Sequence, residues 1–281
     1  MATQLICNSE KFNSTLTALK KGGREKLHVV ADFDGTLTST LVNGKQVPST
    51  ISILRDGDYL TPEYRKKAHE LYNYYRPFED DPNCPLEKRK KMMNEWWNRH
   101  FDLLVRTGLT KQDLESVVKN ASLNLKAGAK EFLDLLSENN IPLLIISSSG
   151  IGDTIKIYLE QQDLLRNNVH IVTNSFIWDD KGYAVGVKEP IVHALNKDET
   201  SVAHYPFFET IKNRSNVLLL GDGTGDAEMA RGFASKNILK IAFIHRHKAE
   251  EKAFCQSLFD VLIENENYDW VNKITKEIIA G

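Results

Sequence analysis

The stretch Leu27-His28-Val29-Val30-Ala31-Asp32-Phe33-Asp34-Gly35-Thr36-Leu37-Thr38 decides the fold. Its first part, residues 27–31, is a short uncharged run with adjacent valines, which is typical of a strand buried on both faces. A glycine and a threonine then break the pattern, so we expect Asp32 and Asp34 at the carboxyl end of this strand. Ligands bind at that edge of an open parallel α/β sheet.

Asp32 and Asp34 are carboxylates separated by a single residue. Carboxylates held close together repel, and each raises the pKa of the other unless a cation lies between them. A hard divalent cation such as Mg²⁺, which takes oxygen ligands and keeps several waters, would remove that repulsion. Taken alone, the pair is equally compatible with an ordinary polar loop, since aspartate is a common turn residue. The rest of the sequence therefore has to decide between these interpretations.

The composition is that of an ordinary soluble globular protein. The chain has 281 residues, of which 41% are hydrophobic and 26% charged, and its formal net charge is -2. This balance gives no electrostatic reason to expect nucleic acid or a membrane surface as a partner. We see no apolar stretch long enough for a transmembrane helix and no signal peptide. The scattered Cys7, Cys84 and Cys255 suit a reducing compartment, so we expect a cytoplasmic protein.

Residues 41–121 are predicted to form a helical unit inserted after the first strand. We interpret residues 40–58, which are polar and rich in turn formers, as the linker into this unit. Thr61-Pro62 is typical of the first positions of a helix, and we expect Pro77 to end that helix. A longer helix with an apolar stripe of methionine and aromatic residues is predicted from Pro85 to Arg106.

Residues 1–40 and 122–281 are predicted to form the two parts of one α/β core. A helix is expected over residues 9–21, ended by Gly22-Gly23. After residue 127, strands and helices alternate, which indicates a parallel sheet with helices on both faces. The predicted strands are 143–146, 169–172, 217–220, 239–244 and 261–263, with an antiparallel hairpin of 176–178 and 183–187 and helices that include 226–231 and 248–258.

Polar residues follow three of the predicted strands, where they can meet at one edge of the sheet. Asp32 and Asp34 follow the first, Ser147-Ser148-Ser149-Gly150 follows the second, and Gly221-Asp222-Gly223-Thr224-Gly225-Asp226 follows the third. Small hydroxyl groups and backbone N–H groups at the start of a helix favour an anion. Lys197 is a candidate for the cation that such a site needs. Each of these features is weak alone, but together they indicate a phosphate site beside carboxylates.

These segments resemble the four ordered motifs of the haloacid dehalogenase superfamily of phosphatases: Asp32-Phe33-Asp34-Gly35-Thr36, Ser148, Lys197 and the glycine-rich turn at 221–226. A closer resemblance is to the cytosolic pyrimidine 5′-nucleotidase family (cytosolic 5′-nucleotidase III). It is carried by Ser148-Ser149-Gly150-Ile151-Gly152-Asp153, His193-Ala194-Leu195-Asn196-Lys197-Asp198, Leu219-Leu220-Gly221-Asp222, Glu79-Asp80-Asp81-Pro82 and Glu95-Trp96-Trp97. The resemblance implies a Rossmann-like core with an inserted helical cap.

The resemblance also implies a mechanism. Asp32 would attack a phosphate monoester and form an aspartyl-phosphate, and Asp34 would act as general acid and base. Mg²⁺ would bind the carboxylates of Asp32 and Asp222 and the main-chain carbonyl of Asp34. Ser148 and Lys197 would hold the phosphate oxygens, and Asp226 would either reach the metal through water or orient Lys197. Within the chain, Ser147 competes with Ser148 and Lys188 competes with Lys197 for these roles.

The expected substrate is a small molecule, a pyrimidine nucleoside 5′-monophosphate. By resemblance, Glu79 and Trp97 are the candidate base contacts, and Ser149 is a further substrate contact. Because Trp96 and Trp97 are adjacent, we expect only one of them to face the cleft squarely. His100-Phe101 stands where the family has a Ser-His pair, so a cationic base such as 7-methylguanine is an alternative.

Other activities remain alternatives at this stage. The sequence Gly-Asp-Gly at residues 221–223 also resembles the phosphoserine phosphatase branch of the superfamily. A nucleoside phosphotransferase would use the same aspartyl-phosphate with an acceptor other than water. An inactive binding protein is disfavoured because no motif residue is lost. The sequence predicts no oligomeric state.

Overall fold

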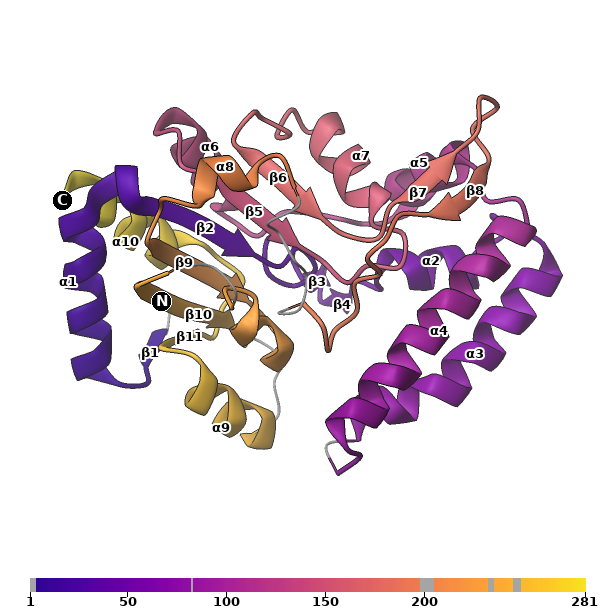
Figure 1. The fold of residues 1–281 in the computed structure, drawn as a ribbon, viewed down its shortest axis with the longest axis horizontal. Coiled ribbons are helices and arrows are strands. Elements are labelled where there is room, and N and C mark those ends of the chain that lie inside the picture. Colours follow the sequence, from indigo (N-terminus) through magenta and orange to yellow (C-terminus); the bar gives the residue numbers. More distant parts are fainter. Residues whose placement is uncertain (1–3, 82, 198–204, 232–234, 245–248) are drawn as a thin grey trace.

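A seven-stranded sheet forms the centre of the molecule. The computed structural model describes residues 4–81, 83–197, 205–231, 235–244 and 249–281. The strand order is β1-β11-β10-β9-β2-β5-β6, and neighbours run parallel except β1, which is antiparallel to β11 (Figure 1). The strands are β1 (Gln4–Ile6), β2 (Leu27–Ala31), β5 (Leu143–Ile146), β6 (Val169–Val172), β9 (Asn216–Gly221), β10 (Asn237–Phe243) and β11 (Val261–Ile263).

The register of the three central strands brings their polar ends to the same level. Ala31 of β2 lies opposite Leu220 of β9 and Ile145 of β5. The chain keeps this register beyond the strand, because the Asp32 N–H donates to the Leu220 carbonyl at 3.0 Å. All residues of β2 are buried, as their apolar sequence predicts for a central strand covered on both faces.

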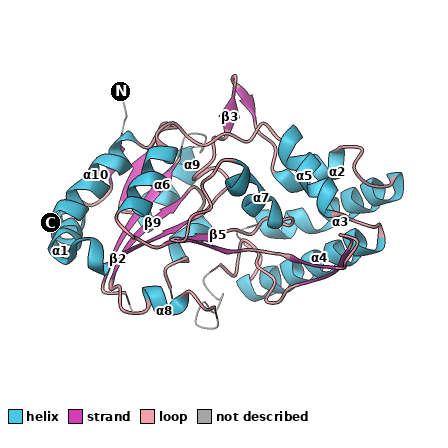
Figure 2. Ribbon diagram, turned by 90° about the horizontal axis from the view of Figure 1, so that it is seen from above, coloured by secondary structure: helices cyan, strands magenta, loops and turns pink. Residues whose placement is uncertain are grey.

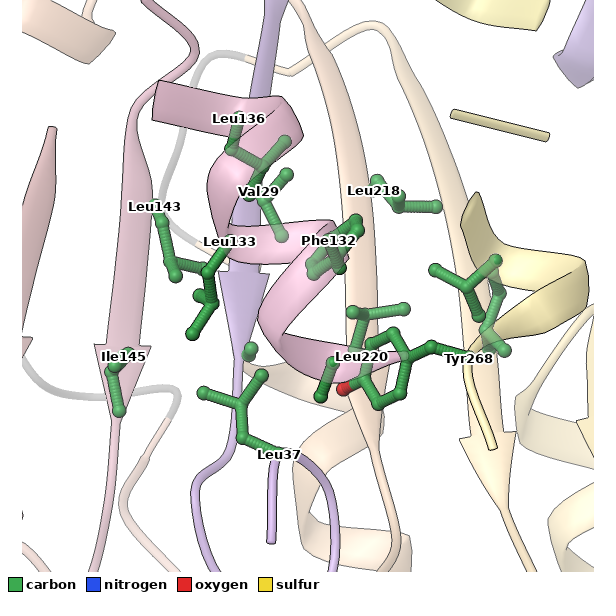
Figure 3. Packing of buried hydrophobic residues seen from close by; sticks show 14 of the residues in the cluster. Val29, Leu37, Phe132, Leu133, Leu136, Leu143, Ile145, Leu218, Leu220 and Tyr268 are labelled. Atoms are coloured by element: carbon green, nitrogen blue, oxygen red, sulfur yellow. The ribbon is translucent and has the colours of Figure 1, made fainter. Parts of the chain in front are cut away.

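Helices cover both faces of the sheet. The first face is packed by α1 (Ser9–Lys26), α6 (Ala129–Glu138), α7 (Asp153–Gln161) and α10 (Asp269–Ala280). Figure 3 shows α6 over the sheet, with Phe132 and Leu136 above Val29, Leu218 and Leu220. The other face is packed by α8 (Phe208–Ile211) and α9 (Ala249–Leu258). The α/β class is therefore confirmed, with an antiparallel edge strand, β1, that the sequence did not predict.

A helical unit extends from one end of the sheet (Figure 2). It contains α2 (Thr50–Asp56), α3 (Pro62–Asp80), α4 (Leu86–Arg106) and α5 (Lys111–Asn120). The hairpin of β7 (Phe176–Trp178) and β8 (Ala184–Val187), from later in the chain, packs on this unit, and the Phe101 and Phe176 rings meet edge to face at 5.9 Å. The division into 1–40, 41–121 and 122–281 stays a prediction.

The interpretation of residues 40–58 as a linker was wrong. This segment forms a small hairpin, β3 (Leu41–Val42) and β4 (Lys45–Gln46), followed by α2. Asn43 and Gly44 take positive φ values of 52° and 72°, which is the signature of a tight hairpin turn. The short helix α2 is stabilised by burial of Leu54 and Arg55, a tertiary effect that local propensity does not reveal.

One predicted helix end was also wrong. Helix α3 continues through Pro77 to Asp80, and Arg76 forms ion pairs with Glu79 and Asp80 across the turn that contains the proline. The predicted end of the first helix at Gly22-Gly23 is confirmed, because Gly23 takes a non-helical φ of 56°, and a further helical turn then runs to Lys26 within α1.

Other predictions need smaller corrections. The helix expected at 226–231 is a 3₁₀ turn, Thr224–Glu228. Pro82, Asp198 and Lys248, which carried parts of the sequence predictions, lie outside the described residues. Among the described helices, none combines the length and hydropathy needed to cross a bilayer.

Candidate active site

A buried lysine joins two carboxylates at the edge of the sheet where β2 and β9 end. Lys197 Nζ donates to Asp32 Oδ1 at 2.8 Å and to Asp226 Oδ1 at 2.7 Å. All three side chains are buried, with at most 9% of their surface exposed. The fold therefore brings together residues separated by up to 194 positions in the chain, as the sequence analysis expected. Lys188, the competing lysine, instead lines a different cavity, with Thr173 and Pro190.

Asp226 holds this arrangement in place. Its second oxygen, Oδ2, accepts hydrogen bonds from the N–H groups of Asp222 at 3.0 Å and Gly223 at 2.8 Å. Both carboxylate oxygens of Asp226 are thus occupied by protein donors. Of the two roles predicted for Asp226, this geometry favours orienting Lys197.

Two glycines permit the close approach of the acidic side chains. Gly35 has a φ of +76°, and a Cβ there would lie 2.1 Å from Asp222 Oδ2. At Gly221 a Cβ would lie 2.4 Å from the Cβ of Asp226. A side chain at either position would push the carboxylates apart, so the packing of the acidic cluster requires glycine at these two positions.

Burial and mutual repulsion dominate the electrostatics of the cluster. Burial raises the pKa of Asp32 to about 7, although Lys197 opposes this shift. Burial and the carboxylates of Asp226 and Asp32 raise the pKa of Asp222 well above its usual range. Burial would lower the pKa of Lys197, but Asp226 and Asp32 raise it, so the lysine carries its charge at neutral pH.

The donor set fits a hard divalent cation. Asp32, Asp222 and Asp226 each place one carboxylate oxygen within 4.8 Å of the others. Three carboxylates with a single lysine leave an excess of negative charge, which a bound cation would offset. Oxygen ligands of this kind suit Mg²⁺. Asp34 contributes no side-chain oxygen to this group of three.

Asp34 faces the open side of the site. It lines a cavity of about 290 Å³ and a neighbouring one of about 800 Å³. Burial raises its pKa, with Lys197 acting in the opposite direction. A carboxyl group that faces a cavity and holds its proton more tightly than usual is suited to donate that proton to a bound substrate.

The two competing serines, Ser147 and Ser148, have different surroundings in the loop that follows β5. Ser147 is buried, and its Oγ accepts the N–H of Ser149 at 3.1 Å. Ser148 and Ser149 line the 290 Å³ cavity together with Asp34. Ser148 is therefore the serine with access to a ligand beside Asp34.

Asn174 links the serine loop (residues 147–150) to the lysine loop (residues 188–197), and no sequence pattern indicated this role. This residue is fully buried just after β6. Its Nδ2 donates to the carbonyls of Ser149 at 3.0 Å and Val192 at 2.8 Å, and its Oδ1 accepts the Val192 N–H at 2.9 Å. One side chain thus holds together the segments that carry Ser148 and Lys197.

The far side of the 290 Å³ cavity is aromatic. It is lined from the helical unit by Arg55, Tyr72, Arg76, Glu79, Trp96, Trp97 and His100. Trp96 and Trp97 stack with centroids 5.5 Å apart and an interplanar angle of 10°, and both line the cavity. The expectation that only one indole faces the cavity squarely stays a prediction. Trp97 also packs on the serine loop, because a Cβ at Gly150 would lie 2.2 Å from its ring.

The polar groups of this aromatic wall include Glu79, Arg76, His100 and Arg55. Glu79 lies in the cavity as predicted, and its Oε2 accepts from Arg76 at 2.8 Å. Burial lowers the pKa of His100 to about 3, and Arg55 adds to the shift, so this imidazole is neutral. Arg55 was missed because its segment was interpreted as a linker.

Comparisons with known proteins agree with this geometry. The sequence model of the family described as pyrimidine 5′-nucleotidase (UMPH-1) matches residues 35–279. The 7-methylguanosine phosphate-specific 5′-nucleotidase of Homo sapiens is 34% identical over 281 residues, covering 99% of this chain and 93% of that protein. The 7-methylguanosine phosphate-specific 5′-nucleotidase A of Xenopus laevis is 35% identical over 274 residues, covering 96% and 94%.

Two solved structures are similar to this chain in fold. Cytosolic 5′-nucleotidase IIIB bound to cytidine superposes with a TM-score of 0.90 at 25% identity, covering 98% of this chain and 93% of that one. A phosphoserine phosphatase, solved as a phospho-aspartyl intermediate analogue, superposes with a TM-score of 0.52 at 18% identity, covering 88% and 97%. The second likeness concerns the fold alone.

Proposed function

The chain belongs to the pyrimidine 5′-nucleotidase family of the haloacid dehalogenase superfamily and is a phosphoric monoester hydrolase, and from this premise we propose that it hydrolyses pyrimidine nucleoside 5′-monophosphates. The reaction uses Mg²⁺ and passes through an aspartyl-phosphate on Asp32. The observation that carries the proposal is the buried Lys197 between Asp32 and Asp226, beside a cavity that runs from Asp34 to an aromatic wall.

Asp32 is the proposed nucleophile. Its carboxylate attacks the phosphorus, the bond to the nucleoside oxygen breaks, and the phosphoryl group is carried by Asp32. Lys197 supports this step by keeping the carboxylate ionised and by offsetting its repulsion with the phosphate. Water then attacks the phosphorus of the intermediate, which frees inorganic phosphate and restores Asp32.

Asp34 is the proposed general acid and base. Its raised pKa suits a group that gives a proton to the leaving 5′ oxygen in the first step. The resulting carboxylate accepts a proton from the attacking water in the second step. Its position on the cavity wall, outside the group of three carboxylates, supports this division of labour.

The phosphate oxygens are held by Ser148 and Lys197. Ser148 and Ser149 line the same cavity as Asp34. Mg²⁺ would be held by the carboxylates of Asp32 and Asp222 and by the main-chain carbonyl of Asp34. When bound, it would neutralise charge on the transferring phosphoryl group.

The base is proposed to lie against the aromatic wall, with Glu79 and Trp97 as contacts. Flat aromatic surface with a few polar groups is the usual composition of a base site. A second candidate substrate is 7-methylguanosine monophosphate, which the names of the curated relatives favour. Paired indoles would attract its cationic base. We place the activity in the cytoplasm, in line with the name of the similar cytosolic enzyme.

Phosphate release from UMP, CMP, AMP, GMP, 7-methyl-GMP and phosphoserine, with Mg²⁺ or with EDTA, tests the proposal. We expect metal-dependent turnover of UMP and CMP ahead of the other substrates. Turnover of phosphoserine alone would overturn the nucleotidase proposal while keeping the core mechanism. Rates that rise with an added nucleoside acceptor would instead identify a phosphotransferase.

A further inference from the structure

Arg55 is a buried cation in the wall of the cavity where the base is proposed to lie. It comes from α2, only 8% of the residue is exposed, and it lines the 290 Å³ and 800 Å³ cavities together with Asp34. Resting on the proposed function, we propose that Arg55 decides which base is accepted. Its guanidinium donates to a carbonyl oxygen of an uncharged pyrimidine and repels the cationic 7-methylguanine.

The guanidinium is held in one orientation by three contacts. It lies over the Tyr72 ring, with 4.4 Å from Cζ to the ring centroid. Its Nε donates to Asp56 Oδ1 and its Nη2 donates to Ser52 Oγ, both at 3.2 Å. Within the described part of the chain, Nη1 makes no hydrogen bond. A fixed guanidinium with an unused donor is prepared to bind an acceptor at little cost in entropy.

The other charges on the aromatic wall do not cancel that of Arg55. Glu79 is already paired with Arg76, and His100 is neutral. Asp56, the ion-pair partner of Arg55, has 54% of its side chain exposed, whereas the Arg55 side chain has 10% exposed. Water therefore weakens the influence of Asp56, while the positive charge of Arg55 acts within the cavity.

The charge and the hydrogen-bonding groups of each base determine how it interacts with the Arg55 guanidinium. Cytosine, uracil and 7-methylguanine each carry a carbonyl oxygen that can accept from Nη1, whereas adenine carries none, so it is charge that separates the two pyrimidines from 7-methylguanine. The base of 7-methylguanosine carries a positive charge, which Arg55 repels and the stacked indoles of Trp96 and Trp97 attract. Removal of the Arg55 charge should therefore leave the attraction by the indoles unopposed.

The test compares substrates within each variant. The values of kcat/KM for CMP, UMP and 7-methyl-GMP are measured for the wild type, Arg55→Met and Arg55→Lys, with p-nitrophenyl phosphate as a substrate that has no base. The ratio of 7-methyl-GMP to CMP cancels any loss of folded enzyme, which lowers all rates together. We expect this ratio to rise about tenfold in Arg55→Met, since both bases lose the same hydrogen-bond donor but only the cationic base is relieved of a repulsion.

Arg55→Lys is the matched control because it keeps the charge. We expect its ratio to stay much closer to that of the wild type. A ratio in Arg55→Met within about twofold of the wild type overturns the inference, and so does an equal rise in Arg55→Lys. Failure of the proposed function is distinguishable, since p-nitrophenyl phosphate would then be hydrolysed by the wild type while none of the nucleotides is.

Discussion

The core edge, where Asp32, Lys197 and Asp226 lie, and the aromatic wall of the cavity differ in how many of their polar atoms are hydrogen-bonded within the protein. At the core edge, Lys197 and Asp226 have their charged atoms bound to protein partners, and Asp32 shares the lysine. At the aromatic wall, the buried Trp96 Nε1 and His100 Nδ1 have no hydrogen-bond partner among the described residues. The first arrangement holds its charged groups in place in advance, whereas the second leaves two buried polar atoms of the wall without a hydrogen bond to the described part of the chain.

This comparison predicts two kinds of mutant. Changes at the core edge should reduce turnover of every substrate alike, since all share the phosphate. Changes in the aromatic wall should act through KM and depend on the base. The following substitutions test this separation in order of decreasing effect.

Asp32→Asn should give the largest loss. An amide is a poor nucleophile, so we expect turnover of all substrates to fall at least about 10³-fold. The amide nearly preserves the shape of the carboxylate, and circular dichroism should show an intact fold. Full activity of Asp32→Asn would identify a different nucleophile.

Asn174→Ala should reduce turnover without dependence on the base. The substitution frees Ser149 and Val192 from their shared partner, so the serine and lysine loops lose register, and we expect kcat to fall about tenfold to 100-fold. Steady-state kinetics with CMP and 7-methyl-GMP measure this fall.

Asn168→Ala is the matched control, because Asn168 precedes β6 and donates to the Ile141 carbonyl at 2.9 Å, at the opposite end of the strand. Both variants should lose about 1–3 kcal/mol of stability, but only Asn174→Ala should lose turnover. Equal kcat values in the two variants would contradict a positioning role for Asn174.

Trp97→Leu should act mainly through KM. Loss of the indole removes a stacking surface from the cavity, so we expect KM for nucleotides to rise about tenfold, corresponding to about 1–2 kcal/mol of stacking. The rise should be larger for nucleotides than for p-nitrophenyl phosphate. Trp270→Leu is the control, because Trp270 packs on Phe12 far from the cavity. A drop in kcat without a change in KM would break the separation between the two regions.

Glu266→Gln tests the connection between the core and the helical unit. Glu266 accepts from Ser39 Oγ at 2.8 Å and Thr40 N at 3.0 Å, where the chain leaves the core, and it pairs with the buried Lys126 at 2.8 Å. Burial alone would raise the pKa of Glu266, but hydrogen bonds from Lys126, Thr40 and Ser39 lower it from 4.5 to about 2. Ionised Glu266 therefore stabilises the folded state.

The lowered pKa of Glu266 sets how this stabilisation depends on pH. The stabilisation is complete above pH 4.5 and is lost as the pH falls toward 2, the folded pKa. We expect Glu266→Gln to lose on the order of 2 kcal/mol at pH 7 and much less near pH 2. Thermal unfolding at both values measures this difference, with Glu138→Gln, at an exposed residue at the end of α6, as control. A pH-independent difference would refute the role of the charge.

Three motif residues of the core could be predicted because each follows a short apolar strand. Asp32, Ser148 and Asp222 stand directly or nearly directly after strands whose sequences are unmistakably buried, and parallel strands place such residues at one edge. Asn174 also follows a strand, but it acts through hydrogen bonds to two other loops, and no local sequence pattern predicts those contacts. Arg55 lies in a segment whose helix depends on burial of Leu54, so its own sequence resembles a loop.

The sequence by itself determined the α/β core and the candidate groups at its edge, since strand burial and the order of motifs are visible in local patterns. Tertiary structure alone decided that Asp226 orients Lys197, that both indoles share one cavity, and that Arg55 stands over Tyr72. These facts depend on distances between residues far apart in the chain. Local periodicity determines which face of an element is buried, but not what that face meets.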